Sequence, residues 1–172
     1  SSAYSASTRS NAKWGNPLLS YDGTPLVPPV VDENRNILVT QGYNGTVSHQ
    51  GVNAIDLSCP DGEGEPLYPM RDGVIWQVIS RYSEQCATFN DPGACLENDQ
   101  LSNRVYVAHC DGTSGLYAHF AGPDLITVEV GQRVRARLDQ LGPCGTTGIS
   151  SGPHLHFQVD KSTLDGTVVS SN

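Results

Sequence analysis

The stretch SSGPHLHFQV, residues 150–159, joins a turn-forming start to a strictly alternating pattern. Ser, Gly and Pro favour a turn, and successive side chains of a β-strand point to opposite faces. The alternation therefore predicts a strand with one buried apolar face. The residues of that face are Leu155, Phe157 and Val159. Two of the chain's five histidines, His154 and His156, are expected next to each other on the opposite face.

The rest of the chain consists largely of short apolar runs separated by turn residues, and helical periodicity is hard to find. Such a pattern indicates an all-β fold. The clearest predicted strands are 37–39, 54–57, 73–79, 104–108 and 115–120. Weaker candidates are 125–128 and 138–141. The polar segment 80–102 interrupts this rhythm and is expected to form an extended surface loop at the rim of a groove.

The chain of 172 residues is expected to fold as one compact domain with an added arm. Residues 1–24 are rich in Ser, Asn and Thr at first and then include Trp14, which indicates either an arm that docks through Trp14 or a disordered linker. Residues 25–172 form the expected domain. No apolar stretch approaches the length of a membrane helix. Because the first residues lack an initiator Met and an apolar signal core, we expect a processed product or a fragment of something longer.

The formal net charge is −8. This excess of acidic residues argues against nucleic acid as a partner, because nucleic acid is bound by a basic face. It also argues against electrostatic attraction to acidic membranes or to strongly anionic polymers.

The chain has five cysteines, and no two of them form a CxxC pair. A structural zinc site of the finger type is therefore not expected. Cys86 and Cys95 bracket ATFNDPGA, whose Asp-Pro-Gly turn predicts a local disulfide between them. The sequence does not determine how Cys59, Cys110 and Cys144 pair, and it allows one disulfide among the three. This cysteine usage is typical of a secreted or periplasmic protein.

The remaining histidines and one acidic residue add to the pair on residues 150–159. His49 lies in SHQGVNAID and His119 in LYAHF, while Asp56 is a lone acid in an apolar strand. Catalytic zinc takes three protein ligands from His and Asp or Glu and keeps one position for water. Each signal is weak alone, since a single His is usually a surface residue and Asp56 could simply accept backbone hydrogen bonds. His109, beside a turn, is expected to face solvent.

In this order and context the motifs resemble those of the lysostaphin/LytM-type zinc endopeptidases, which cleave peptide bonds in bacterial cell walls. The similarity covers residues 37–159, and its final GPHLHF is highly specific. The matching positions are His49-Gln50-Gly51, Asp56, Pro60, Leu67-Tyr68-Pro69, Asp72-Gly73-Val74, Tyr117-Ala118-His119, Gly142, Gly145, Thr147-Gly148 and Gly152-Pro153-His154-Leu155-His156-Phe157.

Carried over position by position, the resemblance implies a site with one Zn²⁺ per chain. Its implied zinc ligands are His49, Asp56 and His156. His119 and His154 would be catalytic histidines that do not bind the metal, and Tyr43 is a candidate stabiliser of the oxyanion. The implied fold is an antiparallel β-sheet sandwich of the LytM type (a duplicated hybrid motif) with an open groove and long loops.

The sequence departs from the family pattern in two places. Many relatives have HxxxD at the first two ligands, whereas six residues separate His49 from Asp56 here. The longer spacing still fits an Ala-x-Asp version of the motif, with the extra residues bulging out between the ligands. In the segment VRARLDQLG, Arg137 stands where relatives often have Gly, so a different turn is expected there.

The function that the resemblance implies is zinc-assisted hydrolysis of peptidoglycan cross-links or of Gly-rich peptides by a monomeric, secreted or periplasmic endopeptidase. One alternative is a non-catalytic binding module on the same scaffold, although all three ligands and both further histidines are present. A second alternative is a biotinyl- or lipoyl-like carrier. Such carriers need a lysine in a tight hairpin, and the only lysines, Lys13 and Lys161, are not in one.

Overall fold

The computed structural model describes residues 38–83, 85–86, 102–162 and 168–169. Within these residues the chain forms strands and no helix, which confirms the expected all-β class. It also contains no helix long and apolar enough to cross a membrane within the same residues. The predicted arm, residues 1–24, lies outside the described residues, so its boundary with the domain stays a prediction.

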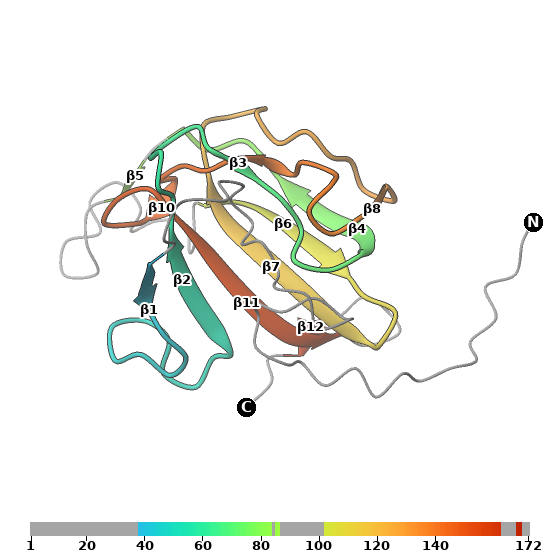
Figure 1. Cartoon of the computed structure of the whole chain (residues 1–172), viewed down its shortest axis with the longest axis horizontal. Coiled ribbons are helices and arrows are strands. Elements are labelled where there is room, and N and C mark those ends of the chain that lie inside the picture. Colours follow the sequence, from blue (N-terminus) through green and yellow to red (C-terminus); the bar gives the residue numbers. More distant parts are fainter. Residues whose placement is uncertain (1–37, 84, 87–101, 163–167, 170–172) are drawn as a thin grey trace, which may run out of the picture.

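An eight-stranded sheet, antiparallel throughout, forms the main layer of the molecule (Figure 1). Its strands in spatial order are β1 (Val39–Gln41), β2 (Ala54–Ser58), β11 (His154–Ser162), β7 (Thr113–Phe120), β6 (Asn103–Ala108), β4 (Gly73–Ile79) and β8 (Arg133–Val134), with β12 (Val168–Val169) also paired to β11. β11, the strand with the histidine pair, therefore lies between β2 and β7 in the middle of the sheet.

Two small sheets accompany the main one. β3 (Pro66–Leu67) pairs with β9 (Gly142–Pro143) in antiparallel fashion. β5 (Gln85–Cys86) pairs with β10 (Gly148–Ile149), and this pairing is parallel. The segment predicted as a long loop over residues 80–102 thus contributes a short strand at its start, while residues 87–101 lie outside the described part of the chain.

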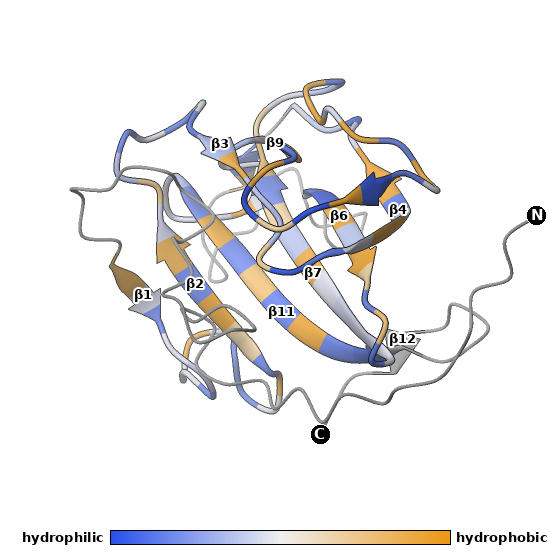
Figure 2. Cartoon of the chain, turned by 45° about the vertical axis from the view of Figure 1, so that its right-hand side comes forward, coloured by the Kyte–Doolittle hydropathy of each residue, from blue (hydrophilic) through white to orange (hydrophobic). Residues whose placement is uncertain are grey.

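The core lies between one face of the main sheet and the segments that carry β3 and β9. The alternation of β11 is visible as bands of opposite hydropathy along the strand (Figure 2). Its apolar positions pack with those of the neighbouring strands. The buried sheet residues include Leu57, Ile75, Val105, Val107, Tyr117, Val134, Leu155 and Phe157, and the covering segments add Leu67, Met70, Val128 and Leu141. This packing buries one face of the sheet, and the opposite face carries the polar residues of the alternating strands.

The weaker strand candidates were wrong. Residues 125–128 and 138–141 form no strand, and β8 forms between them instead. The apolar side chains are buried without sheet pairing, because Val128 and Leu141 pack into the core from extended loops. The amide of Thr127 donates to the carbonyl of Leu141 and ties the two loops together.

A disulfide joins Cys59, which follows β2, to Cys144, which follows β9. Their Cα atoms are 6.7 Å apart and 85 residues separate them in sequence. Cys110 is free and exposed. Cys86 is disulfide-bonded, whereas Cys95 lies outside the described residues, so the Cys86–Cys95 bond stays a prediction.

One further expectation is corrected by packing. His109 is buried, with 7% of its surface exposed, and its Nδ1–H donates to the carbonyl of Asp72 at 2.9 Å. His109 directly follows β6, and its ring lies in the interior of the protein instead of facing solvent. Arg137 adopts φ 66°, the left-handed conformation that glycine favours. Arg137 thus occupies a backbone conformation that suits glycine, and the expected difference from the turn of relatives stays a prediction.

Candidate metal and catalytic site

The site lies on the open face of the main sheet, along one row of residues that crosses five strands. In antiparallel sheets, directly opposite residues place their side chains on the same face. The register pairs Gln41 with Asp56, Asp56 with His156, His156 with Ala118, and Ala118 with Arg104. This central row brings together residues from β1, β2, β11, β7 and β6.

His119 joins this face through a bulge in β7. Asn103 pairs with Phe120 and Arg104 with Ala118, so His119 has no partner on β6. Its φ is 69°, a left-handed value. An extra residue shifts the alternation by one, which is why Tyr117 and Phe120, three positions apart, are both buried in the core. The same shift leaves His119 with Ala118 on the open face.

His49 comes from the loop between β1 and β2. Its amide donates to the carbonyl of Gly45 at 3.0 Å, and its own carbonyl accepts from the amide of Val52 at 3.3 Å. These turns bring His49 back over Asp56, where its side chain is fully buried. The six residues between His49 and Asp56 are thus taken up by a looped-out segment, as the longer motif requires.

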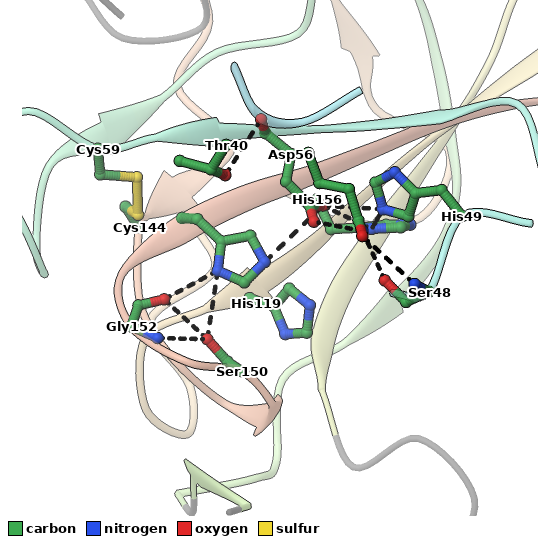
Figure 3. A network of polar contacts seen from close by, with 12 residues as sticks. Thr40, Ser48, His49, Asp56, Cys59, His119, Cys144, Ser150, Gly152 and His156 are labelled. Carbon is green, nitrogen blue, oxygen red and sulfur yellow. Dashed lines mark hydrogen bonds and ion pairs between the residues drawn. A yellow bond between two sulfur atoms is a disulfide. The ribbon is translucent and has the colours of Figure 1, made fainter. Parts of the chain in front are cut away.

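Three candidate ligand atoms converge at the centre of the row (Figure 3). Nε2 of His49 lies 3.2 Å from Oδ1 of Asp56, Nδ1 of His156 lies 2.9 Å from the same oxygen, and the two nitrogens are 3.3 Å apart. A tetrahedral zinc site with bonds of about 2.1 Å separates its ligand atoms by about 3.4 Å. The donor set and its spacing therefore fit zinc.

The contacts around these atoms have the polarity of an outer shell around a metal. Nδ1–H of His49 donates to the carbonyl of Gly42 at 3.1 Å, which leaves Nε2 as the lone-pair atom. The side-chain amide of Gln41 donates to Oδ2 of Asp56 at 3.2 Å, which leaves Oδ1 facing the histidines. Metal-binding His and carboxylate side chains are commonly held in this way.

The two remaining histidines lie at the edge of this cluster, and a backbone carbonyl holds each ring at its Nδ1 atom. Nδ1–H of His119 donates to the carbonyl of Thr147 at 2.7 Å, and Nδ1–H of His154 donates to the carbonyl of Gly152 at 2.8 Å. Both rings therefore present an unprotonated Nε2 when neutral. The ring centroids are 4.6 Å apart, and Nε2 of His154 lies 3.8 Å from Oδ1 of Asp56.

Burial and charge set the protonation of two of these groups. Burial raises the pKa of Asp56, but the hydrogen bond and charge of His156, together with His154 and His49, outweigh it and hold the pKa below its ordinary value. Burial, reinforced by the neighbouring His154, lowers the pKa of His119 to about 3. Asp56 is thus an anion and His119 a neutral imidazole at pH 7.

A cleft of about 780 Å³ opens over the cluster. Asp56, His119, His154 and His156 all line it, and Arg104 lines its β6 side. Tyr43 is not among the lining residues, and 69% of its surface is exposed. The structure therefore brings together His49, Asp56, His119, His154 and His156 and leaves Tyr43 outside the cleft.

Sequence reasoning missed the residues that orient the ligands. Gln41 and the carbonyls of Gly42, Thr147 and Gly152 come from loops or from a short edge strand. No local periodicity marks these positions. The one usable signal is the spacing of Tyr117 and Phe120, two aromatic residues three positions apart. This spacing breaks the strict alternation of a strand and points to a bulge.

A model of "Peptidase family M23" matches residues 48–170 of the chain. The match spans the ligand loop, the central strands and the GPHLHF motif. The chain belongs to peptidase family M23. A curated relative, described as an uncharacterized metalloprotease of Buchnera aphidicola, is 32% identical over 111 residues, which are 64% of this chain. The chain covers only 23% of that relative's length.

Solved structures of the M23 fold resemble the chain as well. A zinc-containing peptidase from Vibrio cholerae matches with a TM-score of 0.53 and 26% identity, over 83% of this chain and 37% of that one. The catalytic domain of lysostaphin from Staphylococcus simulans matches with a TM-score of 0.51 and 23% identity, over 77% and 85% of the two chains. The antiparallel fold expected from sequence is thus shared with these structures.

Proposed function

We propose that this M23 family member is a zinc-dependent endopeptidase that hydrolyses peptide bonds in bacterial peptidoglycan cross-links or in Gly-rich bridges. The observation that carries the proposal is the convergence of three ligand atoms within 3.3 Å of each other beneath a cleft lined by two further oriented histidines. A binding module without catalysis would need the ligands but would have no use for His119 and His154.

His49, Asp56 and His156 would hold the metal through Nε2, Oδ1 and Nδ1. When bound, zinc supplies Lewis acidity that polarises a carbonyl and lowers the pKa of water. Asp56 contributes one negative charge to the site, and the two imidazoles contribute none. Gln41 and the carbonyl of Gly42 fix the ligand atoms, so little rearrangement is needed on metal binding.

His119 and His154 would handle protons during hydrolysis. Each ring is fixed by a carbonyl at Nδ1, so each can accept a proton only at Nε2, which faces the cleft. One of them would take a proton from the attacking water, and the pair would pass a proton to the leaving amine. Ser150, whose Oγ lies 3.2 Å from Nδ1 of His154, would help to keep that ring in place.

The expected substrate is an extended peptide laid across the strands, because the cleft follows the central row over the open sheet face. Family membership and the likeness to lysostaphin, described as an antimicrobial peptidase, support a cell-wall substrate. The Cys59–Cys144 disulfide supports a location outside the cytoplasm, secreted or periplasmic. We expect the chain to act as a monomer.

The direct test combines metal analysis with digestion of purified sacculi and of a pentaglycine peptide. The purified protein should carry about one zinc per chain, and Asp56→Ala should lose it because a ligand is removed. His119→Ala and His154→Ala should keep zinc while turnover falls by about 100-fold or more, since each removes a proton-transfer group.

Leu138→Ala serves as the control and should keep near wild-type turnover, since Leu138 is exposed and does not line the cleft. If zinc-loaded wild-type protein leaves both sacculi and pentaglycine intact, catalysis is excluded and the binding-module alternative takes its place. Loss of zinc from His119→Ala or His154→Ala would make that residue a ligand instead.

A further inference from the structure

The polar face of β11 continues beyond the candidate metal site. The alternation of the strand places Gln158 and Asp160 on the same open face as His156. Gln158 is opposite Leu116 of β7, and both residues line the cleft. Because a strand advances about 3.3 Å per residue, Gln158 lies about 7 Å from His156 along β11. Gln158 is therefore a direct neighbour of the central row.

Asp160 is a buried carboxylate with a single hydrogen-bond donor. It has 3% of its surface exposed, and both of its oxygens accept from Nε2 of Gln158, each at 2.9 Å. No lysine, arginine or histidine in the described part of the chain forms an ion pair with it. Burial raises the pKa of Asp160, against the lowering effects of Gln158 and His156. One amide thus leaves the buried charge incompletely compensated.

This contact fixes which end of the Gln158 amide faces the cleft. An ionised carboxylate only accepts hydrogen bonds, so the NH₂ group of Gln158 must point toward Asp160. The carbonyl oxygen Oε1 then points away from Asp160, on a side chain that lines the cleft. Oε1 accepts from no described residue, and it is not among the enclosed polar atoms that lack a partner. It is therefore an acceptor that a bound molecule can reach.

The chemistry of this acceptor favours a cationic donor. Hydrogen bonds in a chain polarise one another, so the contact with Asp160 makes Oε1 a stronger acceptor than an isolated amide oxygen. Charge-assisted hydrogen bonds are roughly twice as strong as neutral ones. An ammonium group is a compact point charge that can donate to one oxygen, whereas a guanidinium group is suited to two acceptors. The net charge of −8 also attracts cations to this protein.

We propose that Gln158, held by Asp160, forms a subsite that binds an ammonium group of the peptide substrate, so the cleft selects peptides with a free amino group near the scissile bond. This inference rests on the proposed function and names the substrate class of the same site. A peptide along the central row passes about 7 Å from Gln158. The amino group is therefore carried by a flexible side chain or by a chain end.

The experiment uses a matched pair of substrates. One is the cross-linked peptide fraction released from sacculi, with its amino groups free, and the other is the same fraction after acetylation, which removes their charge. For wild-type protein, kcat/KM should favour the free-amine form by about tenfold or more, the worth of a charge-assisted hydrogen bond. In Gln158→Leu this ratio should fall to near one, because the acceptor is gone. Asp160→Asn should lower it too, because a neutral carboxamide no longer fixes the orientation of Gln158.

Glu129→Gln is the matched control, since it removes one negative charge at an exposed position outside the cleft. It should keep the wild-type ratio. A wild-type ratio near one, or a ratio unchanged in either Gln158→Leu or Asp160→Asn, would overturn the proposal. If Gln158→Leu does not fold by thermal melting, Asp160→Asn decides between the same outcomes.

Binding separates this inference from the proposed function. Dissociation constants for the two peptide forms, measured by calorimetry on His119→Ala with and without Gln158→Leu, need no turnover. If no peptide is hydrolysed but the free-amine form binds about tenfold more tightly through Gln158, the proposed function fails and the ammonium subsite stands. If hydrolysis is normal and neither rate nor binding shows the preference, only the subsite fails. Binding of neither form would also overturn the subsite.

Discussion

Asp56 presents its two carboxylate oxygens to different partners. Oδ1 faces the histidines, while Oδ2 accepts from the amide of Gln41. The amide of Gln41 is itself oriented, because its Oε1 accepts from the backbone N–H of Ser48 at 3.3 Å and its Nε2 also donates to the hydroxyl of Ser48 at 2.6 Å. Gln41 thus couples the position of the β1–β2 loop to Asp56, a proposed zinc ligand.

Replacing Gln41 with Ala is expected to weaken zinc binding by about tenfold, because the carboxylate loses the partner that fixes Oδ1 toward the metal. Competition with a chelator of known affinity measures this change. Gln50→Ala, an exposed position in the same loop, should leave affinity unchanged. Equal affinity in Gln41→Ala and wild type would show that Asp56 is held by other contacts.

At the scale of elements, the bulge in β7 is held by Thr147. The carbonyl of Thr147 accepts from His119, its hydroxyl donates to the carbonyl of Phe120 at 2.7 Å, and the same hydroxyl accepts from the amide of Asn103 at 2.9 Å. A non-glycine residue at positive φ is costly unless its surroundings fix it. The hydroxyl of Thr147 supplies such contacts to both strands at the bulge, to Phe120 of β7 and to Asn103 of β6.

Thr147→Val keeps the shape of the side chain but removes its hydroxyl. We expect the free energy of unfolding to fall by about 1–3 kcal/mol, because a buried amide and a buried carbonyl each lose a partner. Turnover should fall as well, since His119 loses its fixed position, while zinc content stays the same. Urea unfolding and sacculus digestion measure these effects, with Thr146→Val as the control. Unchanged turnover with lowered stability would separate the bulge from catalysis.

At the scale of the whole molecule, the Cys59–Cys144 disulfide links the strand that carries Asp56 to the segment that contacts His119. Cys59 follows β2, which carries Asp56, and Cys144 lies three residues before Thr147. Both cysteines are buried beside the core. On the core side of the sheet, the disulfide therefore links the strand of Asp56 to the segment that contacts His119.

The double variant Cys59→Ser, Cys144→Ser is expected to lose about 2–5 kcal/mol of stability, because the unfolded chain gains the freedom of a long loop. Denaturant unfolding without reductant measures the loss. Cys110→Ser is the matched control and should change little, since Cys110 is exposed and free. A double variant as stable as wild type would argue that the sheet alone holds these segments.

The buried His109 makes the stability of the whole fold depend on pH. Burial lowers the pKa of His109 below its ordinary value, against the opposing hydrogen bond to Asp72. The unfolded chain therefore binds a proton near pH 6.5 that the folded chain binds only at lower pH. Stability from this group is complete above about pH 6.5 and is lost as the pH falls toward the lowered pKa.

The expected slope is up to about 1.4 kcal/mol per pH unit for this one group. His109→Asn retains a side-chain N–H for the carbonyl of Asp72 but does not titrate, so its unfolding free energy should fall less steeply below pH 6.5. Urea unfolding of both proteins between pH 7.5 and 4.5, with the metal state matched, gives the difference. Parallel pH profiles would mean that His109 titrates alike in both states.

The sequence by itself determined the polar face of β11 and the identity of the site's main residues. Strand alternation acts over neighbouring residues, so the pattern of residues 154–159 was enough to place His154 and His156 on one face. The motifs also identified His49, Asp56 and His119, which the structure gathers within one site. The roles of these residues remain proposals. The main strands followed from the same local rule.

Only the tertiary structure decided how distant segments meet. The register across five strands placed Gln41 and Arg104 in the row of Asp56 and His156, and the bulge turned His119 onto the same face. Packing buried His109 and brought Cys59 to Cys144 over 85 residues. Local patterns carry no record of such pairings, because register, bulges and burial arise from competition among contacts far apart in the chain.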